Sequence, residues 1–388
     1  MNKKPILLHI CNDYPDAIRS SNKTEAVSNL VKHINEFDHV VFSLNRTSRV
    51  ISNVTIRDGS LYSIKYWGLP WGIGLKFNME RVARAIVKII EQNGIVFDIV
   101  HAHKLTIEGI AGYYISRHFG KPLVCTIRGQ TDLMVIHHKP LYKQLFTDIL
   151  EHSSHLFFLA PWTLNVIGQL FSVDVKSKSG MLPNIVFYVD PEKRRQAVFS
   201  NRFITAVRFG AKNFKSKHLD KTLQAFDMAC RSLDDIHLDI AGSGASTHQD
   251  EIDRLFSAVS HTSRIHLIGQ FENEKFCAIL PDYAAFVRPS YPETFGMVFI
   301  EALFAGLPVL HAKNTGIDGY YSDADFAVAV DHRSIVEIAD GMITLFQNQM
   351  DLKCRLNDWL DTGSLKPFLK ENIVNTYIEK ILRVMREK

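Results

Sequence analysis

Short β-rich runs alternate with stretches of helical spacing along most of the chain, and this alternation limits the fold more than any other feature. The first set covers residues 6–10, 40–44, 63–67, 99–103, 123–127 and 156–160. The second set covers residues 203–207, 238–241, 265–268, 286–288, 309–312 and 326–330. Runs that are apolar on both faces and alternate with helices indicate buried parallel strands. The sequence therefore predicts an α/β protein with two Rossmann-like, doubly wound domains.

The length of 388 residues agrees with two domains, because one core rarely grows beyond about 250 to 300 residues. Asp190–Arg195 is charged, contains a proline and has no periodicity, so we expect the linker there. The predicted N-terminal domain covers residues 1–190 and the C-terminal domain residues 191–367. Residues 368–388 have apolar side chains at helical spacing and are expected to form a terminal helix.

Composition excludes several classes of protein. A net charge of +4 is small for a nucleic-acid-binding protein, so no nucleic-acid partner is expected. The five scattered cysteines include no C-x-x-C pair, which favours a reducing compartment over a disulfide framework. No run of about 18 apolar residues and no signal-peptide region is found. We expect a cytoplasmic protein and leave peripheral contact with the inner face of the cell membrane open.

Candidate site residues follow several predicted strands at their carboxyl ends, where open parallel sheets bind ligands. Most of them are polar: they include His101, His103, Arg128, Arg208, Ser290 and the turn Gly242-Ser243-Gly244. If the two domains face each other, these residues would meet in one interdomain cleft. The alternative is that strand ends are polar only because the chain turns in water there.

The segment 288–310 is the most informative part of the sequence. A strand ends at Ser290, and a helix starts near Phe295-Gly296 and stops near Gly306. Glu301 lies in that helix among apolar residues, so its carboxylate must be hydrogen-bonded or paired. The two hydroxyls of a ribose would satisfy it, and Glu293 can reach a second sugar ring. The alternative is a salt-bridged glutamate in the core.

The same helix start offers an anion site. Its first backbone N–H groups have no partner within the helix and can bind a negatively charged group. These amides belong to Phe295, Gly296, Met297 and Val298.

The pattern of Glu293 and Glu301, with Gly-Leu-Pro-Val following, resembles the signature of family 4 of the retaining GT-B glycosyltransferases. Residues 97–103, 126–132, 182–184 and 238–244 resemble further motifs of that family in the same order. The resemblance implies two facing Rossmann-like domains and a C-terminal helix that returns to the N-terminal domain. It also implies transfer of a sugar from a UDP- or GDP-linked donor, bound mainly by the C-terminal domain.

The resemblance implies that Arg208 and Lys217 clamp the diphosphate, which agrees with the need for fixed positive charge on a leaving anion. No metal or other cofactor is then required. The expected acceptor is a saccharide or lipid-linked saccharide, bound mainly by the N-terminal domain, in bacterial surface polysaccharide synthesis.

Three departures from the family pattern affect this interpretation. Arg19–Lys23 occupies the place of a glycine pair, Arg128 replaces a histidine and Ile185 replaces a glycine. Arginine can only donate hydrogen bonds, so Arg128 cannot exchange a proton and is expected to hold an anion. His103 or His101 then remains to position the acceptor hydroxyl. The alternative is that Arg128 pairs with Asp132 as a structural contact.

Other signals leave further interpretations open. Thr247 stands where a dinucleotide fingerprint needs its third glycine, and Asp323-Ala-Asp325 favours a surface turn over a metal site. The apolar stripe of residues 79–90 favours packing on a sheet over membrane contact. Trp67 and Trp71 suit sugar stacking, a lipid interface or the edge of the core. A phosphorylase or epimerase of the same fold, and a two-domain sugar-binding protein, are the rival functions.

Overall fold

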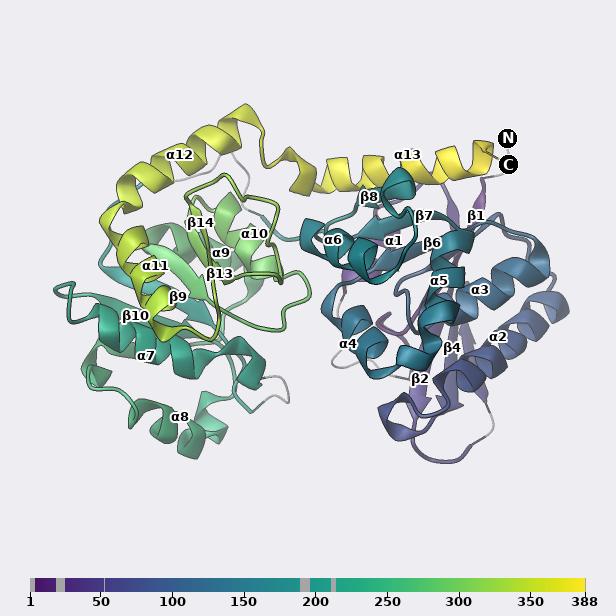
Figure 1. Ribbon diagram of the computed structural model, residues 1–388, viewed down its shortest axis with the longest axis horizontal. Helices are drawn as coiled ribbons and strands as arrows, with labels where there is room; N and C mark the ends of the chain where they lie inside the picture. The colour runs from purple at the N-terminus through teal and green to yellow at the C-terminus, as the bar shows by residue number, and fades with distance from the viewer. Residues whose placement is uncertain (1–3, 19–24, 52, 189–195, 211–213, 388) are drawn as a thin grey trace. The chain divides into compact units, whose positions relative to one another are not determined.

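The computed structural model describes residues 4–18, 25–51, 53–188, 196–210 and 214–387. The chain divides into two compact units, which are treated separately (Figure 1). Unit 1 comprises Met1–Ile185 with Lys370–Lys388, and unit 2 comprises Val186–Leu369. The predicted linker Asp190–Arg195 and the segment Arg19–Lys23 lie outside the described residues.

The described part of unit 1 is built on an eight-stranded sheet in the order β3-β4-β2-β1-β5-β6-β7-β8. Its strands are parallel except for the antiparallel pair of β3 and β4. The strand bounds are β1 Ile6–Cys11, β2 Asp38–Thr47, β3 Val54–Asp58, β4 Leu61–Trp67, β5 Ile99–Ala102, β6 Leu123–Ile127, β7 Ser153–Phe158 and β8 Ser179–Met181.

Helices cover both faces of this sheet, because alternate strand residues point to opposite sides. On one face α2, α3 and α5 pack through residues such as Ile86, Ile110 and Phe146; on the other, α1 and α13 pack through residues such as Leu30 and Tyr377. The helices are α1 Ala26–Lys32, α2 Leu75–Gln92, α3 Glu108–Phe119, α4 Gln130–His138, α5 Lys143–His152, α6 Pro161–Leu170 and α13 Lys370–Arg386, with short 3₁₀ turns η1 Pro70–Gly72, η2 Pro140–Tyr142 and η3 Lys176–Lys178.

Unit 2 contains, in its described residues, a six-stranded parallel sheet in the order β11-β10-β9-β12-β13-β14. Its strands are β9 Arg202–Ala206, β10 His237–Ala241, β11 Ile265–Gly269, β12 Ala285–Arg288, β13 Val309–Ala312 and β14 Ala327–Val330. Its helices are α7 Leu219–Ala229, α8 Gln249–Phe256, α9 Asn273–Ile279, α10 Met297–Phe304, α11 Ile335–Gln347 and α12 Gln349–Thr362, with 3₁₀ turns η5 Phe214–Lys217, η6 Ala245–Thr247, η7 Thr262–Arg264, η8 Leu280–Asp282 and η9 Lys366–Phe368.

Each of the twelve predicted runs overlaps an observed strand, which confirms two doubly wound domains. The sequence analysis missed β3 and β8. All residues of β3 are exposed, so the strand carries no apolar alternation, and β8 has only three residues. The stripe of residues 79–90 lies in α2 and packs on the sheet, with Val82 and Ile86 fully buried. A membrane role for that stripe is therefore wrong.

Candidate active site

A cavity of about 330 Å³ lies in unit 2 at the carboxyl ends of β9, β10 and β12. Parallel strands end at the same edge of the sheet, which brings together residues far apart in the chain. Its lining includes Arg208, Lys217, Gly242, Arg288, Val298 and Glu301. Five of these six were predicted from the sequence, and Arg288 is the addition.

Glu301 is a buried carboxylate that lacks a hydrogen-bond donor. Its residue is 8% exposed on α10, and no donor reaches the carboxylate within the described ranges. Burial raises the pKa of Glu301 to about 7, and the nearby Arg288 only partly opposes this. The alternative of a salt-bridged glutamate in the core is therefore not found among the described residues. A polar atom buried at such a cost is suited to accept hydrogen bonds from a ligand's hydroxyls.

Glu293 is, in contrast, fully engaged by neighbours. Its Oε2 accepts hydrogen bonds from Lys217 Nζ at 2.7 Å, Arg288 Nη2 at 3.0 Å and Ser290 Oγ at 3.2 Å. Burial raises the pKa of Glu293, but Arg288 and Lys217 outweigh it and hold the pKa below the usual value. Glu293 is thus an ionised carboxylate between two cations. Ser290 serves this network and is itself buried.

Arg288 is the functional candidate that the sequence analysis did not single out. It ends β12, its guanidinium lies over the Phe286 and Phe299 rings, and its Nε is buried without a hydrogen-bond partner. Burial lowers the pKa of Arg288, while Glu293 and Glu301 oppose that change. Its position at a strand end, directly before Pro289, was the signal that could have identified it.

Arg208 differs from these buried groups because it is exposed and has no ionic partner among the residues described. It follows β9 directly, and its side chain lines the cavity. A guanidinium that the protein does not neutralise is available to a ligand anion.

The glycines after β10 serve close packing of two loops. At Gly242 the φ angle is +148°, and a Cβ atom would lie 1.6 Å from the Val207 carbonyl oxygen. Gly244, with a φ of +88°, meets the Phe209 carbonyl oxygen in the same way at 2.8 Å. The two glycines therefore let this turn support the loop that carries Arg208. Of the two, Gly242 also lines the cavity.

The start of α10 provides free amides as expected. Gly296, with a φ of +74°, precedes the first helical residue Met297, and Phe295 is buried beneath it. The amides of residues 295–298 have no acceptor in the described part of unit 2. Only Val298 of this group lines the cavity.

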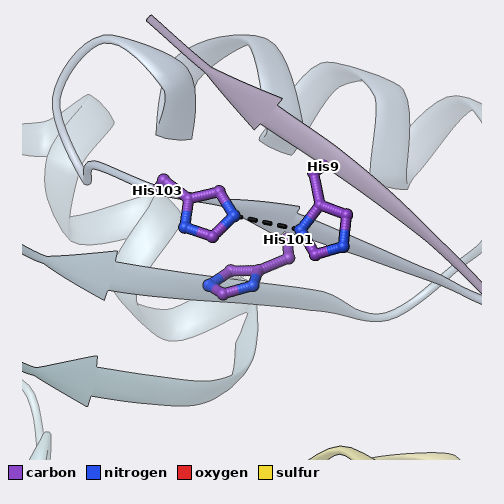
Figure 2. A group of neighbouring side chains, drawn as sticks. All are labelled: His9, His101 and His103. Carbon is purple, nitrogen blue, oxygen red and sulfur yellow. Dashed lines mark hydrogen bonds between the residues drawn. The ribbon is translucent and has the colours of Figure 1, made fainter. Parts of the chain in front are cut away.

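In unit 1, three histidines point toward one another from β1 and the end of β5, as Figure 2 shows. His9 Nδ1 lies 3.0 Å from His103 Nε2, and His9 Nε2 lies 2.9 Å from His39 Nδ1. His101 contacts the Tyr377 hydroxyl and Thr126 Oγ1, each at 2.8 Å. Because both nitrogens of His101 are occupied inside the core, its predicted contact with an acceptor is wrong.

The direction of the hydrogen bonds between His103, His9 and His39 follows from the contact that His39 makes with the backbone. Burial lowers the pKa of His9, His39 and His103, so all three are neutral near pH 7. His39 Nε2 must donate to the Ile34 carbonyl at 3.1 Å, which makes its Nδ1 an acceptor for His9. His9 in turn accepts from His103 Nε2. His103 Nδ1 is then a buried acceptor, and it has no hydrogen-bond partner.

His9, His101 and His103 also form the one group of possible metal ligands in the described residues. Their arrangement does not suit a cation. Both nitrogens of His9 and His101 already have partners, and no carboxylate belongs to the group. Nearby Arg128 adds positive charge. The cluster is therefore best described as a hydrogen-bonded core network.

Arg128 and Asp132 form a second buried network at this sheet edge. Arg128 Nε donates to the His103 carbonyl at 2.9 Å, and its Nη1 lies 3.5 Å from Asn184 Oδ1. Asp132 accepts from the Arg128 backbone N–H at 2.8 Å and from the amide and hydroxyl of Thr106. Asp132 therefore contacts the backbone N–H of Arg128 and not its guanidinium, so the predicted alternative of an ion pair between the two side chains is wrong. Asp132 is fully buried, so its predicted acceptor contact is wrong.

A buried charge cluster beside these residues was missed. Lys104 pairs with Asp13 and lies 3.8 Å from Glu108 Oε1, which accepts a hydrogen bond from the Asn12 amide. Burial raises the pKa of Glu108 to about 7, although Lys104 opposes this. These residues follow β1 and β5, so their position at strand ends was a usable signal.

The two tryptophans occupy different environments. Trp67 ends β4 and lies under Arg81, whose Cζ is 5.6 Å from the ring centroid. Trp71, in η1, is 91% exposed. Of the three roles considered from sequence, the edge of the core is excluded for Trp71.

Comparison with known proteins adds the family. Residues 191–358 match the family model of glycosyl transferases group 1. The chain is 21% identical over 349 residues to an N-acetyl-alpha-D-glucosaminyl L-malate synthase of Bacillus anthracis, covering 88% of this chain and 87% of the relative.

Two solved structures share the fold over the whole chain. A glycosyltransferase from Rickettsia africae aligns with a TM-score of 0.68 at 13% identity, covering 100% of both chains. Anabaena HepE in complex with UDP aligns with a TM-score of 0.67 at 12% identity, covering 98% of this chain and 100% of HepE.

Within the described residues, no helix combines the length and the apolar character needed to cross a membrane. The match of residues 191–358 to the glycosyl transferases group 1 model, the relatives named as glycosyltransferases and the two Rossmann-like units together show a glycosyltransferase of the GT-B fold.

Proposed function

We propose that this glycosyltransferase takes its sugar from a nucleoside diphosphate donor bound in the unit 2 cavity. The proposal rests on two side chains in one cavity, an anionic hydrogen-bond acceptor and a cation, that are left available to a ligand. Among the residues that the structure describes, Glu301 has no hydrogen-bond donor and Arg208 has no anionic partner. The two hydroxyls of a ribose would donate hydrogen bonds to Glu301, and a diphosphate would pair with Arg208. Anabaena HepE was solved with UDP and with UDP-glucose, so we propose a UDP-linked donor and keep a GDP-linked donor as the second candidate.

Charged side chains and amides take the place of a metal ion in this proposal. Arg208 would hold the diphosphate together with Lys217 and the Val298 amide at the start of α10, because these three residues line the same cavity. Lys217 is bonded to Glu293 before the donor arrives, so the diphosphate would share it. The protein therefore needs no cofactor beyond the sugar donor.

We further propose transfer with retention of configuration, as in family 4. Glu293 accepts three hydrogen bonds, two of them from cations, which makes it a poor nucleophile for a double displacement. A front-face route, in which the leaving diphosphate helps to deprotonate the acceptor, fits that arrangement. Glu293 would then orient the donor sugar.

The acceptor would meet unit 1 at the strand ends that carry His103 and Arg128. His103 Nδ1 is an acceptor without a partner and lines a small cavity with Arg128 and Asn184. Arg128 would act as a positioning residue, because its Nε holds the His103 carbonyl. We propose a saccharide or lipid-linked saccharide acceptor, polysaccharide synthesis as the role and the inner face of the cell membrane as the place of action.

Calorimetric titration with UDP and GDP, with and without a chelator, tests the donor site. Binding of one nucleotide that survives chelation and weakens in Arg208→Ala supports the proposal. Binding that needs a divalent ion contradicts it. A sugar-binding protein would instead bind free sugar without nucleotide, and a phosphorylase would require inorganic phosphate.

A second experiment addresses Arg128. Arg128→His and Arg128→Lys should keep nucleotide affinity and lose transfer, because neither side chain reproduces contacts from both Nε and Nη1. Measuring kcat and KM for each variant separates positioning from binding. If Arg128→His is as active as the unmodified enzyme, the position has no role in transfer.

A further inference from the structure

Unit 1 carries exposed apolar side chains on two neighbouring segments of the chain, and we call this set the Trp71 surface. Its members come from η1, the start of α2, α4 and η2. They are Leu69, Trp71, Ile73, Phe77, Met134 and Leu141, exposed by 38%, 91%, 55%, 59%, 57% and 93%. Large apolar groups that gather in this way mark an interaction site, whereas singly exposed ones need no explanation.

The two chain segments that form this surface lie side by side. The Lys139 side chain fills the space beside Gly72, where its Cε would be 3.5 Å from an added Cβ. Lys139 directly precedes η2, which carries Leu141, and Gly72 directly follows Trp71. The two most exposed members, Trp71 and Leu141, therefore belong to neighbouring loops.

The exposed tryptophan is held in place by the fold. Arg46 Nη1 donates to the carbonyls of Gly68 and Leu69, each at 3.0 Å, and Arg81 Nη2 donates to the Trp67 carbonyl at 2.8 Å. Trp71 itself has a positive φ of 57°. The backbone on the N-terminal side of Trp71 is thus fixed by two arginines, and its indole remains in water although burial would be favourable.

The Trp71 surface carries positive charge. The two stretches that contain its members, residues 69–77 and 134–143, hold three lysines (Lys76, Lys139 and Lys143) and no acidic residue. Glu80, one turn further along α2, accepts a hydrogen bond from Tyr114.

We infer that the Trp71 surface docks on an anionic lipid bilayer. Apolar side chains with an amphipathic indole would enter the interface, and Lys76, Lys139 and Lys143 would meet lipid phosphates. The surface follows β4 and β6 and so lies at the same sheet edge as His103 and Arg128. This inference rests on the proposed function for its purpose, since it would bring a lipid-linked acceptor to that edge.

Co-sedimentation with vesicles tests the inference without donor or acceptor. One set of vesicles contains phosphatidylcholine alone, and the other contains equal parts of phosphatidylcholine and phosphatidylglycerol. We expect binding to the anionic vesicles, a loss at high salt and little binding to the neutral ones. Equal binding to both sets, or to neither, overturns the inference.

Two pairs of substitutions locate the surface. Trp71→Ser with Leu141→Ser should lower the vesicle partition coefficient about tenfold or more, because each large apolar side chain contributes at least that much when buried. Val50→Ser with Val96→Ser is the matched control, since these valines of unit 1 are 83% and 60% exposed outside the surface. An equal loss in both pairs contradicts the assignment.

Two further measurements separate the remaining outcomes. Sizing of the protein without lipid must give a monomer, because a dimer that Trp71→Ser with Leu141→Ser abolishes would assign the surface to a second copy and overturn the lipid inference. Titration with UDP should be unchanged in both substituted pairs. If the unmodified protein binds UDP but not anionic vesicles, the lipid surface alone is refuted. If the unmodified protein does not bind UDP, the donor site is refuted.

Discussion

The strand-end edges of the two units use polar residues in opposite ways. In unit 2, Arg208 and Glu301 stand in one cavity with their hydrogen-bonding capacity unmet by the described residues. In unit 1, His9, His101 and Asp132 are fully buried, and their polar atoms largely satisfy one another. A polar side chain at a strand end is thus a ligand-binding candidate only when the protein itself leaves it unsatisfied. The difference predicts distinct responses to pH and to substitution.

The largest expected effect is acid unfolding of unit 1. Burial lowers the pKa of His101 to about 3 and of His155 to about 4, and it also lowers the pKa values of His9 and His103 well below the usual value. Because these histidines protonate more readily in the unfolded chain, their stabilisation is complete above pH 6.5 and is lost as pH falls toward the folded values. Each contributes about 1.4 kcal/mol per pH unit in that window.

Three buried carboxyls act in the opposite direction. Burial raises the pKa values of Glu108 and Asp132 in unit 1 and of Glu301 in unit 2, to about 7 for the two glutamates, so their stabilisation is present at low pH and lost as pH rises through the folded values. In unit 1 these two carboxyls oppose four histidines. In unit 2 Glu301 opposes buried His311, whose pKa burial lowers.

Hydrogen exchange from pH 7 to 4 should therefore show unit 1 opening before unit 2. His155→Gln should flatten the pH dependence of unit 1, and His118→Gln, at an exposed site, should not. If unit 2 opens first, the contrast between the two edges is wrong.

The second effect concerns transfer. Arg208→Ala should lower the rate by roughly 10² to 10³, or about 2.7 to 4 kcal/mol, because a preorganised donor to the leaving anion is lost. The melting temperature should stay the same, since the exposed side chain has no ionic partner in the described structure. Steady-state kinetics of Arg208→Ala and of the control Arg231→Ala, which changes an exposed arginine of the same unit, measures this effect. Full activity of Arg208→Ala would remove this residue from the donor site.

Glu301→Gln should give a smaller effect on nucleotide binding. The loss of charged hydrogen bonds corresponds to about 1.5 to 3 kcal/mol, or roughly 10- to 100-fold in Kd. The unliganded variant should melt at the same or a higher temperature, because an unsatisfied buried charge is removed. Calorimetric titration with UDP, using exposed Glu274→Gln as the control, measures this.

The pH dependence sharpens that test. Only the ionised carboxylate accepts hydrogen bonds from both hydroxyls, so the affinity of the unmodified protein should fall as pH drops below about 7. That dependence should be weaker in Glu301→Gln. Equal slopes in the two proteins would assign the titration to another group.

The smallest expected effect is at Asp323-Ala-Asp325. Both acids are exposed, and Asp325 pairs with Arg355. Asp323→Asn should change stability by about 0.5 kcal/mol or less and leave transfer unchanged. Loss of activity in this variant, together with inhibition by a chelator, would move the chemistry to a metal site there.

Much of the fold could be predicted because its signals are local. Both-face apolar runs such as 123–127 and 309–312 coincide with strands β6 and β13, and the helix predicted after Phe295-Gly296 is α10. β3 could not be predicted, because its residues are exposed and carry no apolar pattern. The strand forms only through its antiparallel pairing with β4. Glu301, Arg208 and Lys217, which the sequence analysis assigned to the donor, line one cavity of unit 2.

The sequence by itself determined which residues end the strands, since that depends on the order of apolar runs and turns. Only the tertiary structure decided which of those residues remain available to a ligand. His101 and His103 are two positions apart, yet His101 is bonded to Tyr377 of α13, 276 residues later, while His103 keeps a nitrogen without a partner. Likewise Arg288 joins Glu293 and the cavity only through folding. Hydrogen-bond satisfaction depends on partners distant in sequence, and periodicity carries no record of them.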